Sequence, residues 1–313
     1  MRAMAIGRYR EAIREIELPS PTPGPRDLLV RVCAASVNPV DYKIRDGVVK
    51  VLIPYSFPLI LGNDLAGDVE AVGPGVTKFK VGDAIYSRLD KDRIGAIAEY
   101  ALVRESAAAK KPARLDYVQA ASLPLVGLTA WQALIDLAHL QAGQKVLIHA
   151  GSGGVGTFAI QLAKHLRAQV ATTASAKNHV LVKSLGADVA IDYKTTRFEE
   201  VAKDQDVIFD TQAGDTLLRS FEAVKPGGVA DDRRPTRRQV RARLGPQPAA
   251  RLDPRVPQPQ GRSPGQEEAR ALRVPVPACE RRAAGKDRRA GGSGRHQTDP
   301  GQDLSAGVAA HAG

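Results

Sequence analysis

Residues 145–166 combine three patterns whose order strongly limits the fold. The run KVLIHA (145–150) is short and almost entirely apolar, as in a buried strand, and GSGGVG (151–156) is a glycine-rich turn. From Val155 onward, apolar residues recur at helical spacing. Further strand-like runs follow at 169–173, 188–192 and 206–210. This alternation predicts an α/β fold built on a doubly wound parallel sheet.

The glycine-rich turn fits the pattern G-x-G-x-x-G, which by itself is equally compatible with a plain flexible loop. Its position between a strand and a helix favours dinucleotide binding. The first glycine then allows the turn, the second lets backbone amides approach a pyrophosphate, and the third lets helix pack on strand. We therefore predict that the whole turn contacts a dinucleotide: Gly151, Ser152, Gly153, Gly154, Val155 and Gly156.

The residues after the second predicted strand indicate which dinucleotide binds. An NAD site needs a carboxylate there for the ribose hydroxyls, but no acidic residue occurs between Gly156 and Asp188. The chain instead offers Thr173, Ser175 and Lys177. Because hydroxyls and an ammonium group accept a 2′-phosphate, we predict NADPH as the cofactor. The alternative for Lys177 is an ordinary solvated helix lysine.

The first 115 residues show a different pattern. Residues 27–37 have the β-branched composition of a strand, and the turn sequences Gly-Pro-Gly and Val-Gly-Asp punctuate residues 65–87. These features predict a small antiparallel β-domain. A helical pattern then covers residues 128–140 and precedes the α/β part.

Six segments together resemble the zinc-independent medium-chain dehydrogenase/reductase superfamily, in particular its quinone oxidoreductase-like, NADP-dependent members. They follow the family's order and spacing at 35–47, 59–83, 95–103, 121–134, 146–156 and 184–193. The resemblance covers residues 1–228. It implies a GroES-like substrate domain (1–115), a Rossmann NADPH-binding domain (116–228) and usually a homodimer. The implied activity is hydride transfer from NADPH to a quinone or an α,β-unsaturated carbonyl compound, both small molecules.

The resemblance also implies site residues. Asn38, Asp41, Tyr42 and Lys43 would line the cleft near the nicotinamide, with Tyr42 or Lys43 donating to the substrate oxygen. Structural roles as loop ion-pair partners are equally open for Asp41 and Arg45. Two further residues would contact the cofactor. Thr129, at the start of a helix, has the alternative of a simple cap, and Tyr193, at the end of the third strand, that of a surface tyrosine.

Zinc-dependent relatives have a cysteine and a histidine where this chain has Asn38 and Asn63. A neutral amide is a poor zinc ligand, and the chain's two cysteines cannot form the four-cysteine structural zinc lobe. Its six histidines lack metal-binding spacing. We therefore predict no metal, with a zinc-type alcohol dehydrogenase relative as the nearest enzymatic alternative.

Residues 229–313 have a composition unlike the rest. These 85 residues include 16 Arg, 14 Ala, 10 Gly and 10 Pro, but no aromatic residue and no Ile. Most of the net charge of +11 lies here, because this segment has 17 basic and 9 acidic residues, against 28 and 25 in residues 1–228. Such a segment cannot build a packed core, so we predict a disordered Arg/Pro/Ala/Gly-rich tail.

The genetic code suggests an origin for this tail. Starting each codon one base later permits three family-like stretches in one frame, beginning near Asp232, Cys279 and Gln297. We therefore predict a frameshift near codon 229. The rival interpretation is a genuine arm that binds RNA or DNA through phosphate contacts. The missing aromatic residues and the acids among the arginines argue against nucleic acid as a partner.

A change of frame would alter the protein. We expect strands five and six to be missing, the fourth strand to form an unpaired apolar edge, and solubility, dimerisation and activity to be weak or lost. The N-terminus lacks the apolar core of a signal peptide, and no window approaches 18 apolar residues, so we expect a cytoplasmic protein without a membrane partner. A non-catalytic NADPH- or nucleic-acid-binding protein remains the alternative to an enzyme.

Overall fold

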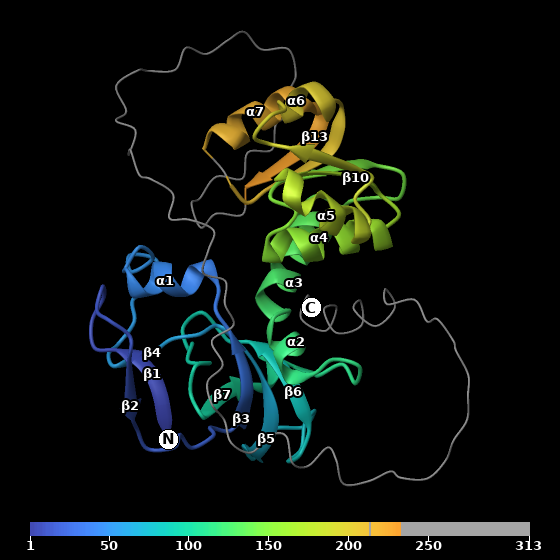
Figure 1. The fold of residues 1–313 in the computed structure, drawn as a ribbon. Helices are drawn as coiled ribbons and strands as arrows, with labels where there is room; N and C mark the ends of the chain where they lie inside the picture. Colours follow the sequence, from blue (N-terminus) through green and yellow to red (C-terminus); the bar gives the residue numbers. More distant parts are fainter. Residues whose placement is uncertain (213, 233–313) are drawn as a thin grey trace, which may run out of the picture. The chain divides into compact units, whose positions relative to one another are not determined.

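A computed structural model describes residues 1–212 and 214–232 of the chain (Figure 1). These residues form two compact units, Met1–Leu125 and the described residues from Val126 onward. The predicted disordered tail, 229–313, lies outside the described residues except for its first four. The domain ranges 1–115 and 116–228 stay predictions.

The first unit contains two antiparallel sheets. The smaller has the strand order β2-β1-β4, and the larger the order β7-β3-β5-β6-β8. Leu28, Val30, Leu65 and Ile85 are fully buried in the core of the larger sheet. The antiparallel β-domain predicted for this part of the chain is therefore confirmed. The strand bounds are β1 Arg2–Ile6, β2 Arg14–Glu17, β3 Asp27–Ser36, β4 Leu59–Ile60, β5 Asp64–Val72, β6 Ala84–Arg88, β7 Tyr100–Arg104 and β8 Ala108–Lys110.

Two short α-helices and one 3-10 helix complete this unit: α1 (Pro39–Arg45), α2 (Tyr117–Ala121) and η1 (Glu105–Ala107). Helix α1 begins directly after β3 because Asn38 is extended, with φ −116°, and Pro39 occupies the first turn. Proline fits that position, since its ring fixes a helical φ and its missing N–H would have no partner there.

The second unit is a parallel five-stranded sheet of order β11-β10-β9-β12-β13, flanked by helices. Leu147 and Ile208, in its two central strands, are fully buried. This confirms the predicted α/β fold with a parallel sheet. The strands are β9 Lys145–Ile148, β10 Gln169–Ala174, β11 Val189–Asp192, β12 Gln205–Asp210 and β13 Val224–Asp232; the helices are α4 Gly154–His165, η3 Ala176–Asn178, α5 His179–Ser184, α6 Phe198–Val201 and α7 Asp215–Ala223.

The expectation that the fourth strand of this sheet is an unpaired edge is wrong. Strand β13 pairs with β12 in parallel, with Val207 opposite Val229 and Ile208 opposite Ala230. The prediction ended the fold at Gly228, where the family-like sequence stops. A strand needs only backbone pairing and small apolar side chains on its inner face, and Ala230 meets that need, being 6% exposed.

The helix predicted over residues 128–140 begins earlier and changes type. Helix α3 spans Pro124–Trp131, and a π-helix, η2, continues over Gln132–Leu137. The prediction missed the start because a proline in the first turn begins a helix rather than breaking it. Thr129 therefore lies inside α3 and not at its start. Among residues 1–212 and 214–232, no helix has the length and apolar content needed to cross a bilayer.

Candidate functional site

The glycine turn, residues 151–156, joins β9 to α4 in the second unit. Ala150, just before it, has φ +52°, in the left-handed region that L residues rarely adopt. Three hydrogen bonds hold this geometry. The Ala150 carbonyl accepts from Gly153 N at 2.9 Å, Gly151 N donates to the Thr173 carbonyl at 2.9 Å, and Ala150 N donates to Thr173 Oγ1 at 3.1 Å.

The three motif glycines meet different surroundings. A Cβ added to Gly151 would lie 2.0 Å from Thr172 Oγ1, and one added to Gly156 would lie 2.3 Å from the Ala150 carbonyl oxygen. At Gly153 the only atom of the described residues that a Cβ would approach within 4 Å is the Ala150 carbonyl oxygen, at 3.2 Å. The first and third glycines are thus required by packing, whereas the second leaves its outer side free for a ligand.

The N-terminus of α4 lies directly on this turn. Its N-cap, Gly153, contributes no side-chain cap, and its first turn contains no acidic residue. The first-turn amides of Gly154, Val155 and Gly156 have no acceptor four residues earlier within the helix, and the helix dipole adds positive potential there. Backbone donors together with a tightly packed turn suit a diphosphate, so the residues present fit a dinucleotide.

The end of β10 contributes a second polar group. Asn178 Nδ2 donates to Ser152 Oγ at 3.0 Å and to Ser175 Oγ at 3.3 Å, which links the glycine turn to the residues after β10. Lys177 is exposed in η3, and no salt bridge of the described residues includes it. Sequence analysis missed Asn178, although its position three residues after Ser175 is the spacing of a turn contact.

The other three predicted cofactor residues differ in their surroundings. Thr173 is buried in β10, and its hydroxyl contacts Ala150 N and His149 Nδ1 inside the domain. Tyr193, which follows β11, is 50% exposed. Thr129 is half-buried within α3. A role of these three in cofactor binding stays a prediction.

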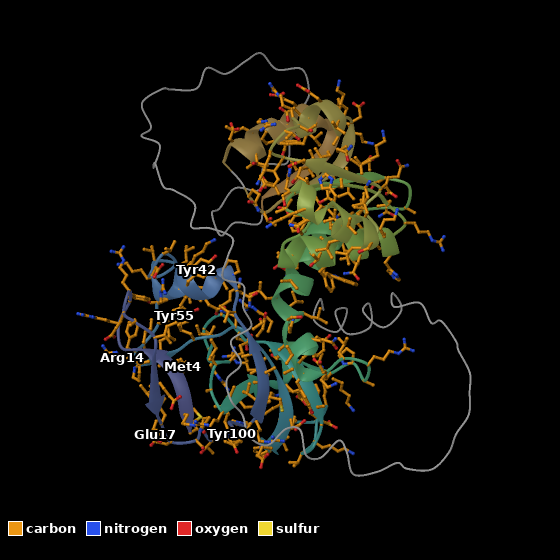
Figure 2. All side chains as sticks on the ribbon, viewed as in Figure 1. Met4, Arg14, Glu17, Tyr42, Tyr55 and Tyr100 are labelled. Atoms are coloured by element: carbon orange, nitrogen blue, oxygen red, sulfur yellow. The ribbon has the colours of Figure 1, made fainter. Side chains whose placement is uncertain are left out.

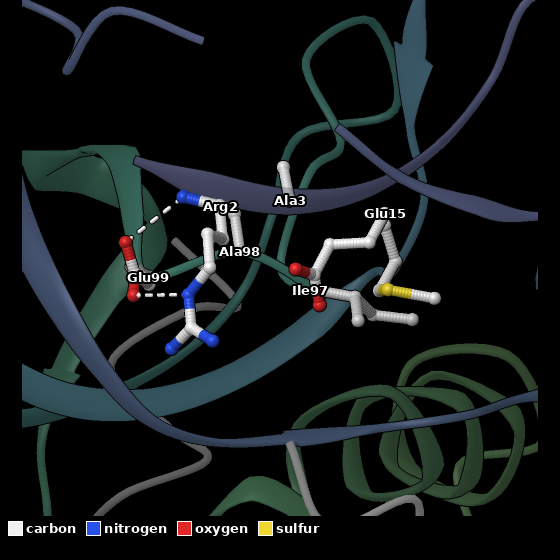
Figure 3. A pocket seen from close by; sticks show the side chains of 7 residues that line it. Arg2, Ala3, Glu15, Ile97, Ala98 and Glu99 are labelled. Atoms are coloured by element: carbon white, nitrogen blue, oxygen red, sulfur yellow. Dashed lines mark hydrogen bonds and ion pairs between the residues drawn. The ribbon is translucent and has the colours of Figure 1, made fainter. Parts of the chain in front are cut away.

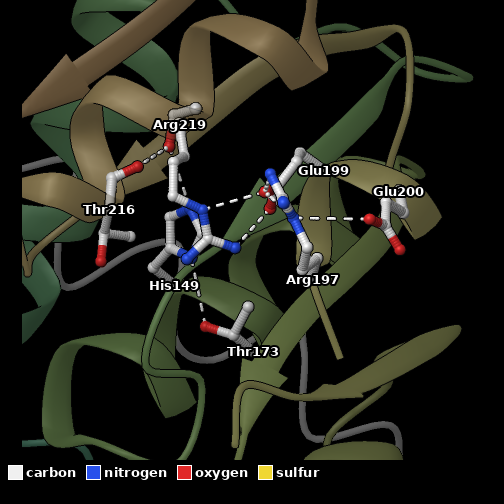
Figure 4. Close-up of polar contacts among 8 residues, drawn as sticks. His149, Thr173, Arg197, Glu199, Glu200, Thr216 and Arg219 are labelled. Carbon is white, nitrogen blue, oxygen red and sulfur yellow. Dashed lines mark hydrogen bonds and ion pairs between the residues drawn. The ribbon is translucent and has the colours of Figure 1, made fainter. Parts of the chain in front are cut away.

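A buried polar cluster that the sequence did not reveal surrounds His149, two residues before the turn (Figure 4). His149, 1% exposed, makes a T-shaped contact with Phe198, with ring centroids 4.5 Å apart. Beside it, the buried carboxylate of Glu199 binds Arg219 and Arg197. Burial, reinforced by the Arg219 charge, lowers the pKa of His149 to about 4. The hydrogen bond from Arg219 lowers the pKa of Glu199 to about 2.

In the first unit, a carboxylate network surrounds the start of α1. Asn38 N donates to Asp41 Oδ2 at 2.6 Å, and Asn63 Nδ2 donates to Asp41 Oδ1 at 2.7 Å. Asn38 Nδ2 donates to Asp64 Oδ2 at 2.9 Å and to Ser36 Oγ at 3.1 Å. All but Ser36 are buried. The network thus contains two predicted residues, Asn38 and Asp41.

Asp64 is the most constrained member of the network and was not predicted. Its Oδ2 atom accepts from Ser36 Oγ and Leu125 N in addition to Asn38. Its Oδ1 atom is buried without a hydrogen-bond partner among the described residues. Burial raises the pKa of Asp64 to about 7, and burial also raises the pKa of Asp41.

The other two predicted catalytic residues lie on the outer side of the same helix. Tyr42 is 48% exposed on α1 (Figure 2), and Lys43 is half-buried. Arg45 pairs with Asp46 at 2.8 Å, while Asp41 bonds to the asparagines. The structure therefore divides the four residues into a buried pair, Asn38 and Asp41, and a more accessible pair, Tyr42 and Lys43.

The positions that hold zinc in metal-dependent relatives do not fit a metal here. Asn38 and Asn63 both direct their amide N–H groups at carboxylates, so that each donates hydrogen bonds where a metal ligand would offer a lone pair. In the described part of the chain, no three His, Cys, Asp or Glu side chains are placed to hold a metal ion.

A small pocket beside β1 is separate from these features (Figure 3). An ion pair of 2.9 Å between Arg2 Nε and Glu99 Oε1 closes one side of it. It contains none of the predicted site residues, so we assign it no role. Its lining residues are Arg2, Ala3, Met4, Glu15, Ile97, Ala98 and Glu99.

Each of the two units matches a known family model. The family model of the alcohol dehydrogenase GroES-like domain matches residues 24–113, and that of zinc-binding dehydrogenase matches residues 154–230. The structure is also similar to that of the quinone oxidoreductase from Coxiella burnetii, with a TM-score of 0.67, 34% identity and 74% of each chain covered.

Two curated proteins of Arabidopsis thaliana are similar in sequence. The chloroplast envelope quinone oxidoreductase homolog is 43% identical over 196 residues, which cover 61% of this chain and 60% of that protein. The chloroplastic NADPH-dependent alkenal/one oxidoreductase is 40% identical over 209 residues, covering 64% and 53%. The chain thus spans 53% to 60% of the length of these relatives.

Proposed function

The chain belongs to the quinone oxidoreductase-like medium-chain dehydrogenase/reductase family, and from that premise we propose that it is an NADPH-dependent oxidoreductase acting on a quinone or an α,β-unsaturated carbonyl compound. The observation that carries the proposal is the uncapped N-terminus of α4 behind a glycine turn whose middle glycine is open on its outer side. The names of the two plant relatives support the substrate class.

The proposed cofactor site is assigned as follows. The amides of the glycine turn, from Gly151 to Gly156, bind the diphosphate. Ser175 and Lys177 bind the 2′-phosphate, helped by Asn178, which holds Ser175 and Ser152 in place. Thr129 and Tyr193 are proposed as further contacts. When bound, NADPH supplies a hydride at its nicotinamide ring.

Preference for NADPH over NADH rests on the absence of an acidic side chain after β10. A carboxylate there would repel the 2′-phosphate, whereas Ser175 and the ammonium group of Lys177 attract it. Thr173, predicted earlier for the same purpose, supports Ala150 with its hydroxyl, and we assign it that role instead.

On the substrate side, α1 supplies the proposed groups. Reduction of a quinone or enone places negative charge on the substrate oxygen, which a hydrogen-bond donor stabilises. Tyr42 and Lys43 are accessible donors for that oxygen, and one of them then supplies the proton. The buried Asn38 and Asp41 orient the start of α1 through the bond from Asn38 N to Asp41 Oδ2.

We further propose that residues 229–313 are the product of a frameshift and that this weakens dimerisation and activity. The family model ends at residue 230, close to the proposed point. Sequencing the transcript across codon 229 tests this directly, since a shifted frame that encodes no family-like continuation would contradict it. A cytoplasmic location, and a nucleic-acid role of the tail as the alternative, stay predictions.

The cofactor proposal is tested by fluorescence titration of the purified chain with NADPH and NADH. We expect tighter binding of NADPH, and equal or tighter binding of NADH would contradict it. Adding a small quinone or an enone to the NADPH complex tests the reaction, followed as loss of absorbance at the nicotinamide band. Binding without turnover would favour a non-catalytic NADPH-binding protein. Metal analysis of the same sample tests the zinc-type alternative.

A further inference from the structure

A continuous series of hydrogen bonds joins the glycine turn to α7 through His149 (Figure 4). Ala150 N donates to Thr173 Oγ1 at 3.1 Å, and Thr173 Oγ1 lies 3.2 Å from His149 Nδ1. On the other side of the ring, His149 Nε2 lies 3.2 Å from Ser220 Oγ, which donates to the Thr216 carbonyl at 2.7 Å. We call these three side chains, of Thr173, His149 and Ser220, the relay.

The protons of the relay can be placed by counting donors. The Ser220 hydroxyl proton is used on the Thr216 carbonyl, so Ser220 Oγ accepts from His149 and Nε2 must carry the ring proton. In the neutral ring Nδ1 is then an acceptor, and it receives the Thr173 hydroxyl proton. The opposite tautomer would leave the Thr173 proton without a recorded acceptor, so only one arrangement satisfies every group.

The surroundings keep the ring neutral, as this arrangement requires. His149 is buried in a T-shaped contact with Phe198, and the guanidinium group of Arg219 lies 4.8 Å from the centroid of the Phe198 ring. Protonation of His149 would turn Nδ1 into a donor facing a hydroxyl that already accepts from Ala150 N. Both burial and the nearby Arg219 charge oppose that protonation, and together they outweigh Glu199, whose negative charge favours it and which is paired with Arg219.

The relay ends at the backbone of Ala150. Its φ of +52° is unfavourable for a residue with a Cβ, so its backbone must be held from outside. Its carbonyl accepts from Gly153 N and lies against Gly156. A rotation at Ala150 would therefore move the same amides that face the proposed diphosphate.

We propose that Thr173, His149 and Ser220 are positioning residues that fix Ala150, so that the affinity of the glycine turn for a dinucleotide depends on helix α7. The inference rests on the proposed function for the identity of the ligand, but the relay can be tested without any ligand. None of the three side chains touches the cofactor in this assignment, because each acts through the Ala150 backbone.

The first test measures the ring itself in the full chain. Nitrogen NMR of ¹⁵N-histidine-labelled protein, with His149 assigned by the His149→Gln spectrum, should show a neutral ring protonated at Nε2 at pH 7. A ring protonated at Nδ1, or a charged ring, would overturn the relay. Hydrogen exchange at the Ala150 amide should be at least about tenfold faster in Thr173→Val than in the wild type. An unchanged exchange rate would overturn it as well.

The second test measures binding in the same chains. Thr173→Val and Ser220→Ala should each raise the Kd for NADPH about fivefold, and the Kd for NADH by the same factor, because the diphosphate is common to both. His149→Gln keeps one acceptor and one donor, so its Kd should stay within about twofold of the wild-type value. His149→Phe keeps an aromatic ring but loses both hydrogen-bonding groups, so its Kd should rise as in Thr173→Val and Ser220→Ala.

The matched control is Ser184→Ala, since Ser184 also donates to a carbonyl of its own helix, that of Leu181, at 2.7 Å but contacts no histidine. Its Kd should not change. Wild-type affinity in both Thr173→Val and Ser220→Ala would overturn the inference. If the wild-type chain binds neither coenzyme, the proposed function fails, and the NMR and exchange results alone decide whether the relay holds Ala150.

Discussion

Asn38 and Asp64 are joined by a buried hydrogen bond of 2.9 Å, in which Asn38 Nδ2 donates to Asp64 Oδ2. Two more donors, Ser36 Oγ and Leu125 N, converge on the same oxygen. The other carboxyl oxygen has no hydrogen-bond partner among the described residues. Three donors on one oxygen do not offset the burial of the charge, which is why the pKa of Asp64 is raised to about 7.

Substitution Asp64→Asn should change how stability depends on pH. Between about pH 4 and pH 7 the folded protein keeps the Asp64 proton that the unfolded chain has lost, so wild-type stability falls as pH rises. The variant lacks this term. Its free energy of unfolding should therefore improve relative to wild type by about 3 kcal/mol between pH 4 and pH 7. Urea unfolding at several pH values measures the difference.

The control for this experiment is Asp136→Asn, at an exposed carboxylate. Its curve should run parallel to that of wild type. His149 gives wild type a slope of opposite sign, because its pKa is lowered to about 4 and stability is lost as pH falls from about 6.5. In Asp64→Asn, the rise of stability with pH that His149 causes is therefore opposed by Asp41, whose pKa is also raised by burial, and no longer by Asp64. A curve for Asp64→Asn parallel to wild type would show that Asp64 is ionised when buried.

Much of the fold could be predicted because its signals are local. The strand-like runs at 169–173 and 206–210 are recognisable from residue type alone, and they form β10 and β12. The edge strand could not be predicted in this way. Whether Val229 and Ala230 form a strand depends on their pairing with β12, a contact between separate segments of the chain. It does not depend on whether the surrounding sequence resembles a family.

The candidate site also combines features with local sequence signals and features that depend on contacts between distant segments. The glycine turn is a local motif, and its three glycines could be found and given roles from spacing alone. The relay could not, because His149, Thr173 and Ser220 come from three elements and share no sequence pattern. Asp64 was missed for a similar reason: a single carboxylate near a strand end gives no sign that three donors will converge on it.

The glycine turn makes a prediction that separates folding from binding. In Gly156→Ala the new Cβ would lie 2.3 Å from the Ala150 carbonyl oxygen, so the variant should lose about 2 kcal/mol of stability or more. Gly153→Ala has only one close atom, at 3.2 Å, and an extended backbone that alanine adopts. It should remain within about 1 kcal/mol of wild type.

Gly153→Ala should also weaken ligand binding, which NADPH titration measures. The added methyl group lies where the diphosphate is proposed to approach, so Kd should rise about tenfold or more. Thermal unfolding of the two variants gives the stability comparison. A Gly153→Ala chain that folds and binds NADPH as wild type does would contradict the proposed position of the diphosphate.

Glu199 should stabilise the protein only above acidic pH. Its carboxylate, 4% exposed, binds Arg219 and Arg197, and its pKa is lowered to about 2. A lowered pKa means that the stabilisation is present above about pH 4.5 and disappears as pH falls toward 2. Glu199→Gln should thus cost about 2 kcal/mol at pH 7 and progressively less below pH 4.

A neighbouring carboxylate provides the comparison for this prediction. Glu200 contacts Arg197 at 3.4 Å but is 66% exposed, so Glu200→Gln should cost less than about 0.5 kcal/mol at either pH. Denaturant unfolding at pH 7 and pH 3 measures both variants. Equal losses for Glu199→Gln at the two pH values would mean that the negative charge of Glu199 does not account for its effect.

Lys177 should decide between the two coenzymes. It is exposed beside the Asn178–Ser175 contact, where no carboxylate competes for its ammonium group in the recorded salt bridges of the described residues. Lys177→Ala should raise the Kd for NADPH about fivefold, because one charge–phosphate contact at a solvated site is lost, and leave the Kd for NADH unchanged.

The control for this prediction is Lys183→Ala, which removes another exposed lysine, from α5, and should change the Kd of neither coenzyme. The NADPH effect should shrink as salt is added, since screening weakens an exposed contact first. Equal weakening of both coenzymes by Lys177→Ala would place Lys177 near the diphosphate instead of the 2′-phosphate.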